Sequence, residues 1–263
     1  MSESRVSGHA PIADFIKETL RIIKAADDKG IILRVMGACA FRIHCKKCGY
    51  LHATLTRELT DIDFVTYNKY SGELVPLFVE LGYEPDERII SLYGDRRHIY
   101  YDNKNKRIVD IFIDKLCMSH TIDYKGRLEL DHPTVTVSDL LLQKIQIVKI
   151  NEKDIKDSIM LIREHDVGTN EKETINAKYI AKVFSNDWGF YYTGTTNLKK
   201  IKEFLNVYGV LTEEDKGDVS KKIDELLDYI ENEPKTFGWR LRAKIGTKRR
   251  WYEEVEDIVH SKR

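Results

Sequence analysis

The first stretch of the chain carries helical and strand-like patterns of apolar residues in succession. Residues 12–29 repeat apolar side chains every three or four positions, and Gly30 follows where a glycine often ends a helix. Residues 31–37 form a short, mostly apolar and β-branched run that stops at Gly37, which predicts a buried strand. A helix over 38–47 is predicted next, so the order is helix, strand, glycine turn and helix.

A second strand is predicted over residues 60–67, where polar and apolar side chains alternate. Asp61 and Asp63 face one side of this strand, and Ile62 and Phe64 face the other. Successive side chains of a strand point to opposite faces of the sheet. One face of the strand is therefore acidic.

The pattern then predicts one short helix and three more strands. The helix spans residues 73–82, with Pro76 tolerable only near its first turn. Asp110 alternates with Val109 and Ile111, so it projects from one face of its strand as the earlier aspartates do. The strand candidates are residues 87–93, 96–102 and 106–114, with a turn at 103–105 joining the last two.

From Ser138 onward the period is helical. Ser138 is a candidate N-cap for a helix over residues 138–150, and a second helix is predicted over 152–165. The rest of the chain is rich in helical segments, with breaks expected around residues 187–197 and 232–239.

This change of pattern predicts two domains. Residues 1–165 form an α+β domain with a mixed sheet flanked by helices, and residues 166–263 form a helical domain. With 263 residues, of which 42% are hydrophobic and 33% are charged, the chain can bury a sizeable core.

Charge and hydropathy exclude several classes of protein. The 43 Lys and Arg balance the 43 Asp and Glu, which excludes a bulk-basic nucleic-acid binder and an acidic-tail protein. The longest apolar stretch, residues 31–41, contains Arg34 and is far shorter than the ~20 residues that span a bilayer. The first residues lack the pattern of a signal peptide, and the cysteines are too sparse for a disulfide scaffold. We expect a cytoplasmic protein.

One short segment gathers residues that can bind zinc, namely His44, Cys45, Cys48 and His52. Zinc knuckles use Cys-x-x-Cys, but a closed zinc site normally takes its second pair of ligands from a distant hairpin. Reduced thiols at a helix end are the favoured interpretation, and zinc binding through Cys45 and Cys48 is the alternative.

The strongest candidate site consists of Asp61, Asp63 and Asp110, which lie on strand faces after the glycine turn. Three carboxylates close together repel one another unless a hard dication neutralises them. Oxygen ligands suit Mg²⁺, and two such ions roughly 3.5 to 4 Å apart stabilise the attacking and leaving oxygens of a phosphoryl displacement. A solvated strand face is the alternative.

The stretch MGACAFRIHC, followed by LTDIDFV and RIVDIFIDKL, resembles the nucleotidyltransferase superfamily of the DNA polymerase β type. The signature of this superfamily is a Gly-Gly or Gly-Ser turn, a strand with paired aspartates and a later third carboxylate. Residues 136–162 are similar to helices of bacterial and archaeal members related to abortive-infection toxins. The resemblance covers about residues 30–165, and it implies Mg²⁺, two ions in all, held by Asp61, Asp63 and Asp110.

The resemblance implies transfer of a nucleoside monophosphate from an NTP, ATP included, to a hydroxyl, with release of pyrophosphate. Backbone N–H groups at Gly37 and Ala38 would meet the triphosphate at a helix start. Lys144 would neutralise phosphate charge, Asp154 would support the active site, and Arg97 would contact the nucleotide. The alternatives are an ordinary glycine turn and charged surface faces.

Two departures from the signature stand out. Ala38 replaces the Ser or Gly of many relatives, so a hydroxyl contact to phosphate is missing. Asp61 lies 24 residues after Gly37, which is longer than the usual spacing.

The acceptor hydroxyl remains open between an RNA end, a small-molecule alcohol and a protein side chain. Residues 235–250 contain seven Lys or Arg and no acid, with Phe237 and Trp239 among them, as in a polynucleotide groove. A basic helix end balanced by the following acidic residues is the alternative. A catalytically weak nucleotide- or RNA-binding module of the same fold is the alternative to an enzyme.

Overall fold

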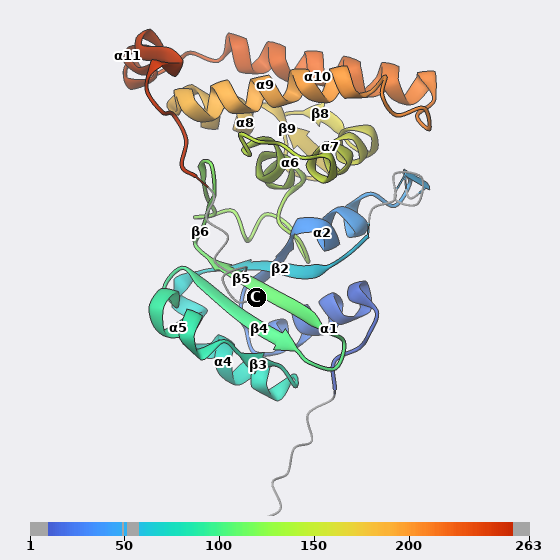
Figure 1. Cartoon of the computed structure of the whole chain (residues 1–263), viewed down its shortest axis with the longest axis vertical. Helices are drawn as coiled ribbons and strands as arrows, with labels where there is room; N and C mark the ends of the chain where they lie inside the picture. Colours follow the sequence, from blue (N-terminus) through green and yellow to red (C-terminus); the bar gives the residue numbers. More distant parts are fainter. Residues whose placement is uncertain (1–9, 49, 52–57, 255–263) are drawn as a thin grey trace, which may run out of the picture. The chain divides into compact units, whose positions relative to one another are not determined.

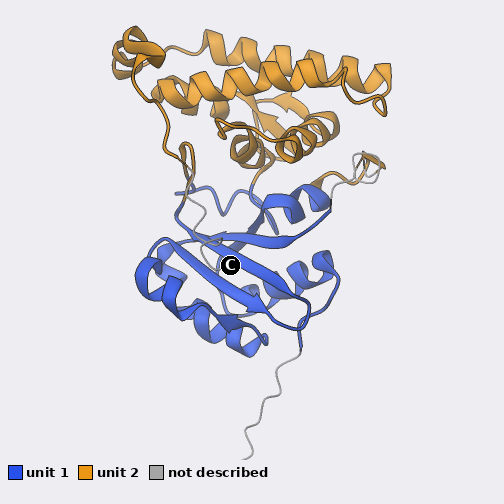
Figure 2. Cartoon of the chain, viewed as in Figure 1, with its two compact units in different colours: residues 1–43, 58–115, 123–135 blue, residues 44–57, 116–122, 136–263 orange. Residues whose placement is uncertain are grey.

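A computed structural model of the chain describes residues 10–48, 50–51 and 58–254 (Figure 1). The chain forms two compact units (Figure 2). The first unit comprises residues 1–43, 58–115 and 123–135, and the second comprises residues 44–57, 116–122 and 136–263.

A five-stranded mixed sheet forms the centre of the first unit, with the strand order β1-β2-β5-β4-β3. Strands β2 and β5 are parallel, and the other neighbours are antiparallel. The predicted α+β class, with a mixed sheet flanked by helices, is confirmed. The strands are β1 (Leu33–Met36), β2 (Asp61–Thr66), β3 (Glu84–Pro85), β4 (Arg97–Asp102) and β5 (Arg107–Ile113).

Four α-helices and one short 3-10 helix accompany this sheet in the described part of the first unit. Helices α1, α4 and α5 contact strands β1, β3 and β4, respectively. These helical elements are α1 (Phe15–Asp28), α2 (Gly37–His44), η1 (Asn68–Tyr70), α4 (Ser71–Glu80) and α5 (Glu87–Tyr93).

The alternation predicted for β2 is present. Ile62 and Phe64 are fully buried in the core, whereas Asp61 and Asp63 are half-buried. Burial of the apolar side chains fixes the register, because a slip of one residue would move them to the opposite face of the sheet. The acidic face of β2 therefore follows from the burial of its apolar face.

Residues 87–93 form helix α5, so the strand predicted there is wrong. The carboxylate of Asp86 accepts a hydrogen bond from the backbone N–H of Ile89 at 3.0 Å and caps the helix. The adjacent β-branched pair, Ile89 and Ile90, favoured a strand from the sequence alone. A local cap together with contact with β4 decides in favour of the helix.

Helix α4 also differs from its predicted form. It begins at Ser71, two residues earlier than expected, so Pro76 lies inside the helix and not in its first turn. A proline there removes one backbone hydrogen bond of the helix. Burial of Leu74, Leu77 and Phe78 in the core offsets that loss.

The second unit is mainly helical. Helix α10 packs against α7, α8 and α9. Two small sheets accompany the helices, one made of β6 and β7 and the other of the parallel strands β8 and β9. The elements are β6 (Lys115–Cys117), β7 (Thr121–Asp123), α6 (Val137–Ile145), α7 (Glu152–Glu164), β8 (Asp166–Gly168), β9 (Thr174–Asn176), α8 (Ala177–Asn186), α9 (Trp188–Phe204), α10 (Glu213–Asn232), α11 (Phe237–Ile245) and η2 (Gly246–Lys248).

The break expected around residues 187–197 is confined to Asp187, between α8 and α9, because residues 188–197 form the first half of α9. Asp187 caps the helix by accepting a hydrogen bond from the N–H of Phe190 at 3.0 Å. A Cβ atom on Gly194 would lie 2.2 Å from the ring of Phe184 in α8. This glycine serves close packing of two helices and does not mark a loop.

The helices after residue 136 follow the predicted period with different ends. Thr136 and not Ser138 caps α6, because its hydroxyl accepts a hydrogen bond from the N–H of Asp139. Helix α6 ends at Ile145, five residues before the predicted end. Helices α6 and α7 belong to the second unit, whereas the predicted division at residues 165 and 166 places them in the first domain.

None of the helices in the described ranges combines the length and the apolar content that crossing a bilayer requires.

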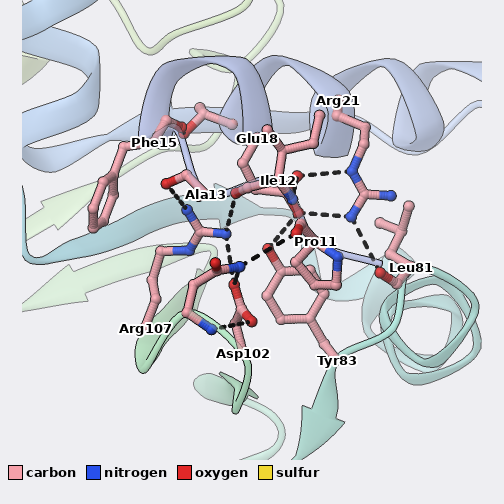
Figure 3. Close-up of polar contacts among 12 residues, drawn as sticks. Pro11, Ile12, Ala13, Phe15, Glu18, Arg21, Leu81, Tyr83, Asp102 and Arg107 are labelled. Carbon is pink, nitrogen blue, oxygen red and sulfur yellow. Dashed lines mark hydrogen bonds and ion pairs between the residues drawn. The ribbon is translucent and has the colours of Figure 1, made fainter. Parts of the chain in front are cut away.

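A buried polar network joins α1 to the sheet of the first unit (Figure 3). The carboxylate of Glu18 is fully buried and accepts hydrogen bonds from the N–H of Ile12, from Arg21 and from the hydroxyl of Tyr83. Burial raises the pKa of Glu18, but the hydrogen bonds from Arg21 and Tyr83 outweigh it and lower the pKa below its ordinary value. Glu18 is therefore a satisfied buried anion.

The second half of the network is an ion pair between Arg107 and Asp102. Their side chains are each 1% exposed, and Nη2 of Arg107 lies 2.7 Å from Oδ2 of Asp102. Arg107 also donates to the backbone carbonyls of Ile12 and Ala13 and lies over the ring of Phe15 (Figure 3). These contacts hold the segment before α1 against the end of β5.

Asp102→Asn tests how much the ion pair between Arg107 and Asp102 contributes to the free energy of unfolding. We expect the free energy of unfolding to fall by about 3 kcal/mol or more, because the guanidinium of Arg107 would remain buried beside a neutral group. Urea unfolding followed by circular dichroism measures the change. Asp28→Asn is the control: it removes the exposed pair with Lys24, and we expect it to cost under about 0.5 kcal/mol. Equal losses in the two variants would contradict the assignment.

Candidate active site

The three predicted metal-binding aspartates lie on neighbouring strands of the first unit. Strands β2 and β5 are parallel, and Asp63 is the register partner of Asp110. Asp61 lies two residues before Asp63 and therefore on the same face of β2. Paired strands are about 4.8 Å apart, so the sheet brings two carboxylates together as direct neighbours and a third close by.

Arg97 provides a positive charge beside this acidic face. It lies on β4, antiparallel to β5, one diagonal step from Asp110. Its Nε lies 2.9 Å from Oδ1 of Asp110, and its Nη2 lies 2.5 Å from Oδ2. The guanidinium also lies over the ring of Phe112, 5.3 Å from the centroid. The expected nucleotide-binding cation is thus bound to the expected third metal ligand.

Asp110 is the most deeply buried of the three aspartates, with only 8% of its surface exposed. Burial raises the pKa of Asp110 above its ordinary value, and although Arg97 opposes this shift, Asp61 adds to it. A carboxylate in this environment needs a positive charge close by if it is to stay ionised. In the structure Arg97 supplies that charge.

The glycine turn lies directly beside the acidic face. Met36, the last residue of β1, is the register partner of Asp63, and helix α2 starts at Gly37 with φ +61°. A Cβ atom on Gly37 would lie 1.9 Å from Oδ2 of Asp63. Two features therefore require glycine at position 37. The backbone is left-handed there, and the carboxylate of Asp63 leaves no room for a side chain. The N-terminus of α2, where Ala38 follows, favours a negative charge at this point.

Lys144 and Asp154 meet each other in the second unit. Nζ of Lys144 lies 3.2 Å from Oδ1 of Asp154 and 3.0 Å from Oδ2 of Asp157. The two aspartates share one face of α7, as their spacing predicts, and Asp157 is fully buried. The three residues therefore form an ion-pair cluster that joins α6 to α7. Their predicted part in nucleotide binding remains a prediction.

The cysteines of the proposed zinc motif are buried free thiols. Burial raises the pKa of Cys45, and it raises that of Cys48 to about 11 with help from Glu164. His52 lies outside the described residues. His44 instead approaches Glu173, its Nδ1 lying 3.2 Å from Oε1.

His165 and Glu173 were missed by the sequence analysis. His44, His165 and Glu173 each offer one potential ligand atom, and these atoms lie within 4.8 Å of one another. The two partners lie more than 120 residues from His44, so no local motif could have indicated them. The Cys-x-x-Cys spacing directed attention to Cys45 and Cys48, and zinc binding through these cysteines stays a prediction.

The basic segment over residues 235–250 forms α11 and the turn after it. Trp239 packs edge-on against Tyr191, and the guanidinium of Arg242 lies 4.8 Å from the ring centroid of Trp188. These groups are used in packing within the second unit. Exposed cations and one exposed ring remain, namely Phe237, Arg240, Lys244, Lys248 and Arg249.

Comparison with known proteins returned no match to a family model, a curated protein or a solved structure.

Gly37→Ala tests the contact between the turn and Asp63. We expect it to lower the free energy of unfolding by about 2 kcal/mol or more, because it adds a steric clash to backbone strain. Gly30→Ala is the matched control, since Gly30 has φ +72° and an added Cβ would meet nothing within 4 Å. We expect strain alone in the control, about 1 kcal/mol. Denaturant unfolding of both variants separates the two effects, and equal costs would rule out the clash.

Proposed function

We propose that the first unit is a metal-dependent nucleotidyltransferase that transfers a nucleoside monophosphate from an NTP to a hydroxyl group and releases pyrophosphate. One observation carries this proposal. Asp61, Asp63 and Asp110 lie on one acidic face of two parallel strands, beside a glycine turn that begins a helix. Carboxylates next to a phosphate-binding turn suit phosphoryl transfer, because they can hold the cations that a triphosphate requires.

The donor set of the acidic face fits Mg²⁺. All three side chains offer carboxylate oxygens, which hard dications prefer. Burial raises the pKa of Asp110 and Asp61 adds to this shift, which supports a place where a further cation is favourable. Bound Mg²⁺ would supply positive charge to the phosphates and to the leaving pyrophosphate. Asp61 and Asp63 would hold the metal, and Asp110 would join them.

The chain's own groups would then divide the remaining tasks. Backbone N–H groups at the start of α2 would bind the triphosphate. The acceptor oxygen would attack the α-phosphorus while the bond to the bridging oxygen breaks and pyrophosphate leaves. Asp110 would take the proton of the attacking hydroxyl. Arg97, replaced at Asp110 by the metal, would donate to phosphate oxygens as a planar bidentate cation.

The acceptor class stays open within this proposal. An RNA end, a small-molecule alcohol and a protein hydroxyl all present the same nucleophile. The exposed cations of α11 and its following turn favour a contact with RNA, because cations hold a phosphate backbone. The zero net charge of the whole chain favours a smaller acceptor.

Pyrophosphate release tests the proposed activity. We expect Mg²⁺-dependent release with at least one NTP when cell extract supplies the acceptor, and labelled NTP identifies the product. Asp61→Asn should lower the rate by about 10²-fold or more, because it removes a charged metal ligand. Asp28→Asn, on the exposed face of α1, is the control and should keep the full rate. Release that Asp61→Asn leaves unchanged would refute the proposal.

A second function, a nucleotide- or RNA-binding module without catalysis, is favoured by the bidentate pairing of Arg97 with Asp110. This contact gives the third carboxylate a cationic partner without a metal. The module predicts NTP binding without turnover across a panel of acceptors. Turnover of any acceptor decides for the enzyme.

Arg97→Met distinguishes the two functions through metal binding. We expect Mg²⁺ to raise the Tm of this variant more than that of the wild type, because the metal no longer competes with the guanidinium for Asp110. Differential scanning fluorimetry with and without Mg²⁺ measures the difference. The double variant Arg97→Met with Asp110→Asn should lose the extra shift. An equal Mg²⁺ shift in wild type and Arg97→Met would place Asp110 outside the metal site.

A further inference from the structure

Three side chains with metal-binding chemistry converge in the second unit. His44 ends α2, His165 directly follows α7, and Glu173 directly precedes β9. One potential ligand atom from each lies within 4.8 Å of the other two. The two imidazole rings meet edge to face, with centroids 5.6 Å apart.

The ring of His165 is prepared for a ligand. Its Nδ1 lies 3.1 Å from the backbone carbonyl oxygen of Glu173, which assigns the proton to Nδ1 as donor. Its Nε2 is buried and has no hydrogen-bond partner among the described residues, and His165 as a whole is only 4% exposed. Histidines that bind metals usually donate their other N–H to a carbonyl or carboxylate, as this one does. Nδ1 of the same ring lies 3.6 Å from Oε2 of Glu173, so the ring lies beside this carboxylate. A buried lone pair without a partner among the described residues requires an explanation, and we assign Nε2 as the ligand atom of this ring.

Glu173 is held in an unusual backbone conformation. Its φ is +48°, in the left-handed region that a glutamate seldom adopts. In this conformation its carbonyl oxygen accepts a hydrogen bond from Nδ1 of His165. Its carboxylate lies 3.2 Å from Nδ1 of His44. Strain of this kind is often kept where it positions functional groups. The side chain is 58% exposed, so the site is open to solvent on the side of the carboxylate.

We propose that His44, His165 and Glu173 form a binding site for a borderline transition-metal dication, Zn²⁺ in the first place. Two imidazole nitrogens and one carboxylate oxygen are a donor set that suits Zn²⁺, whereas Mg²⁺ and Ca²⁺ prefer oxygen ligands only. Three protein ligands leave a fourth position to water, which is the arrangement of open zinc sites. This proposal does not rest on the nucleotidyltransferase activity.

A metal ion at this site would link three segments of the second unit. It connects the end of α2, the end of α7 and the residue before β9, three segments far apart in the sequence. An ion bound only in the folded state stabilises that state, and the stabilisation grows with the logarithm of the ion concentration above the Kd. Bound Zn²⁺ would therefore stabilise the folded second unit by linking these three segments. This effect does not depend on whether the fourth coordination position takes part in a reaction.

Cobalt substitution of the full chain, with any affinity tag removed, tests the site. We expect Co²⁺ to give visible ligand-field absorption at a stoichiometric ratio, and Zn²⁺ to remove it while excess Mg²⁺ does not. Glu173→Gln should weaken Zn²⁺ binding by about tenfold or more in calorimetry, and His165→Gln should weaken it further. Zn²⁺ should raise the Tm of the wild type more than that of either variant.

Two control variants show whether a loss of Zn²⁺ binding is specific to the proposed ligands. Glu152→Gln removes a carboxylate of similar exposure, 63% against 58%, and His120→Gln replaces another buried histidine of the same unit. Both should bind Zn²⁺ as the wild type does. If His165→Gln fails to fold, Glu173→Gln decides, because an exposed Glu-to-Gln change keeps the fold.

Three results would overturn the proposal. The first is a wild-type chain that binds neither Co²⁺ nor Zn²⁺. The second is a Glu173→Gln variant that binds Zn²⁺ with unchanged affinity. The third is a thiolate-to-cobalt charge-transfer band that disappears in Cys48→Ser, which would assign the ion to the cysteines.

Discussion

The repulsion between carboxylates on one sheet face is the constraint around which the first unit is built. The parallel register of β2 and β5 makes Asp63 and Asp110 direct neighbours, and burial removes the water that would otherwise solvate Asp110. A fold keeps such an arrangement only if a cation compensates it. Arg97, on β4, supplies this cation, because its Nε and Nη2 donate to the two carboxylate oxygens of Asp110. The proposed metal would take over the same electrostatic task.

The same principle of paired buried charges recurs in both units, with different consequences. Arg107 and Asp102 form a buried ion pair, and Arg107 also contacts Ile12, Ala13 and Phe15, so the pair serves structure (Figure 3). Lys144 joins α6 to α7 through Asp154 and Asp157. Asp110 is also buried and paired, and burial raises the pKa of its carboxyl while Arg97 opposes the shift. Its neighbours on β2 are also carboxylates, so this face is the better place for an additional cation.

The two proposed cation sites differ in chemistry and therefore in the ion that each selects. The acidic face of the first unit offers oxygen ligands and suits a hard ion that also binds phosphate. The site in the second unit offers two imidazoles and one carboxylate and suits a borderline ion. The left-handed backbone at Glu173 and the buried lone pair of His165 support the proposal of the second site. The cluster of carboxylates supports the proposal of the first.

Local patterns in the sequence determined the elements whose partners are near in the chain. The alternation at Asp61 to Phe64 fixed an acidic strand face, because burial of one side of a strand exposes the other. The helical period after residue 136 determined α6 and α7, and Gly37 marked the turn before α2. Only the tertiary structure decided that Ile89 and Ile90 lie in a helix, that Gly194 packs against Phe184, and that α6 and α7 belong to the second unit. It also decided the partners of Arg97 and His44, because an ion pair or a ligand set forms between residues that folding brings together, and no spacing along the chain records that distance.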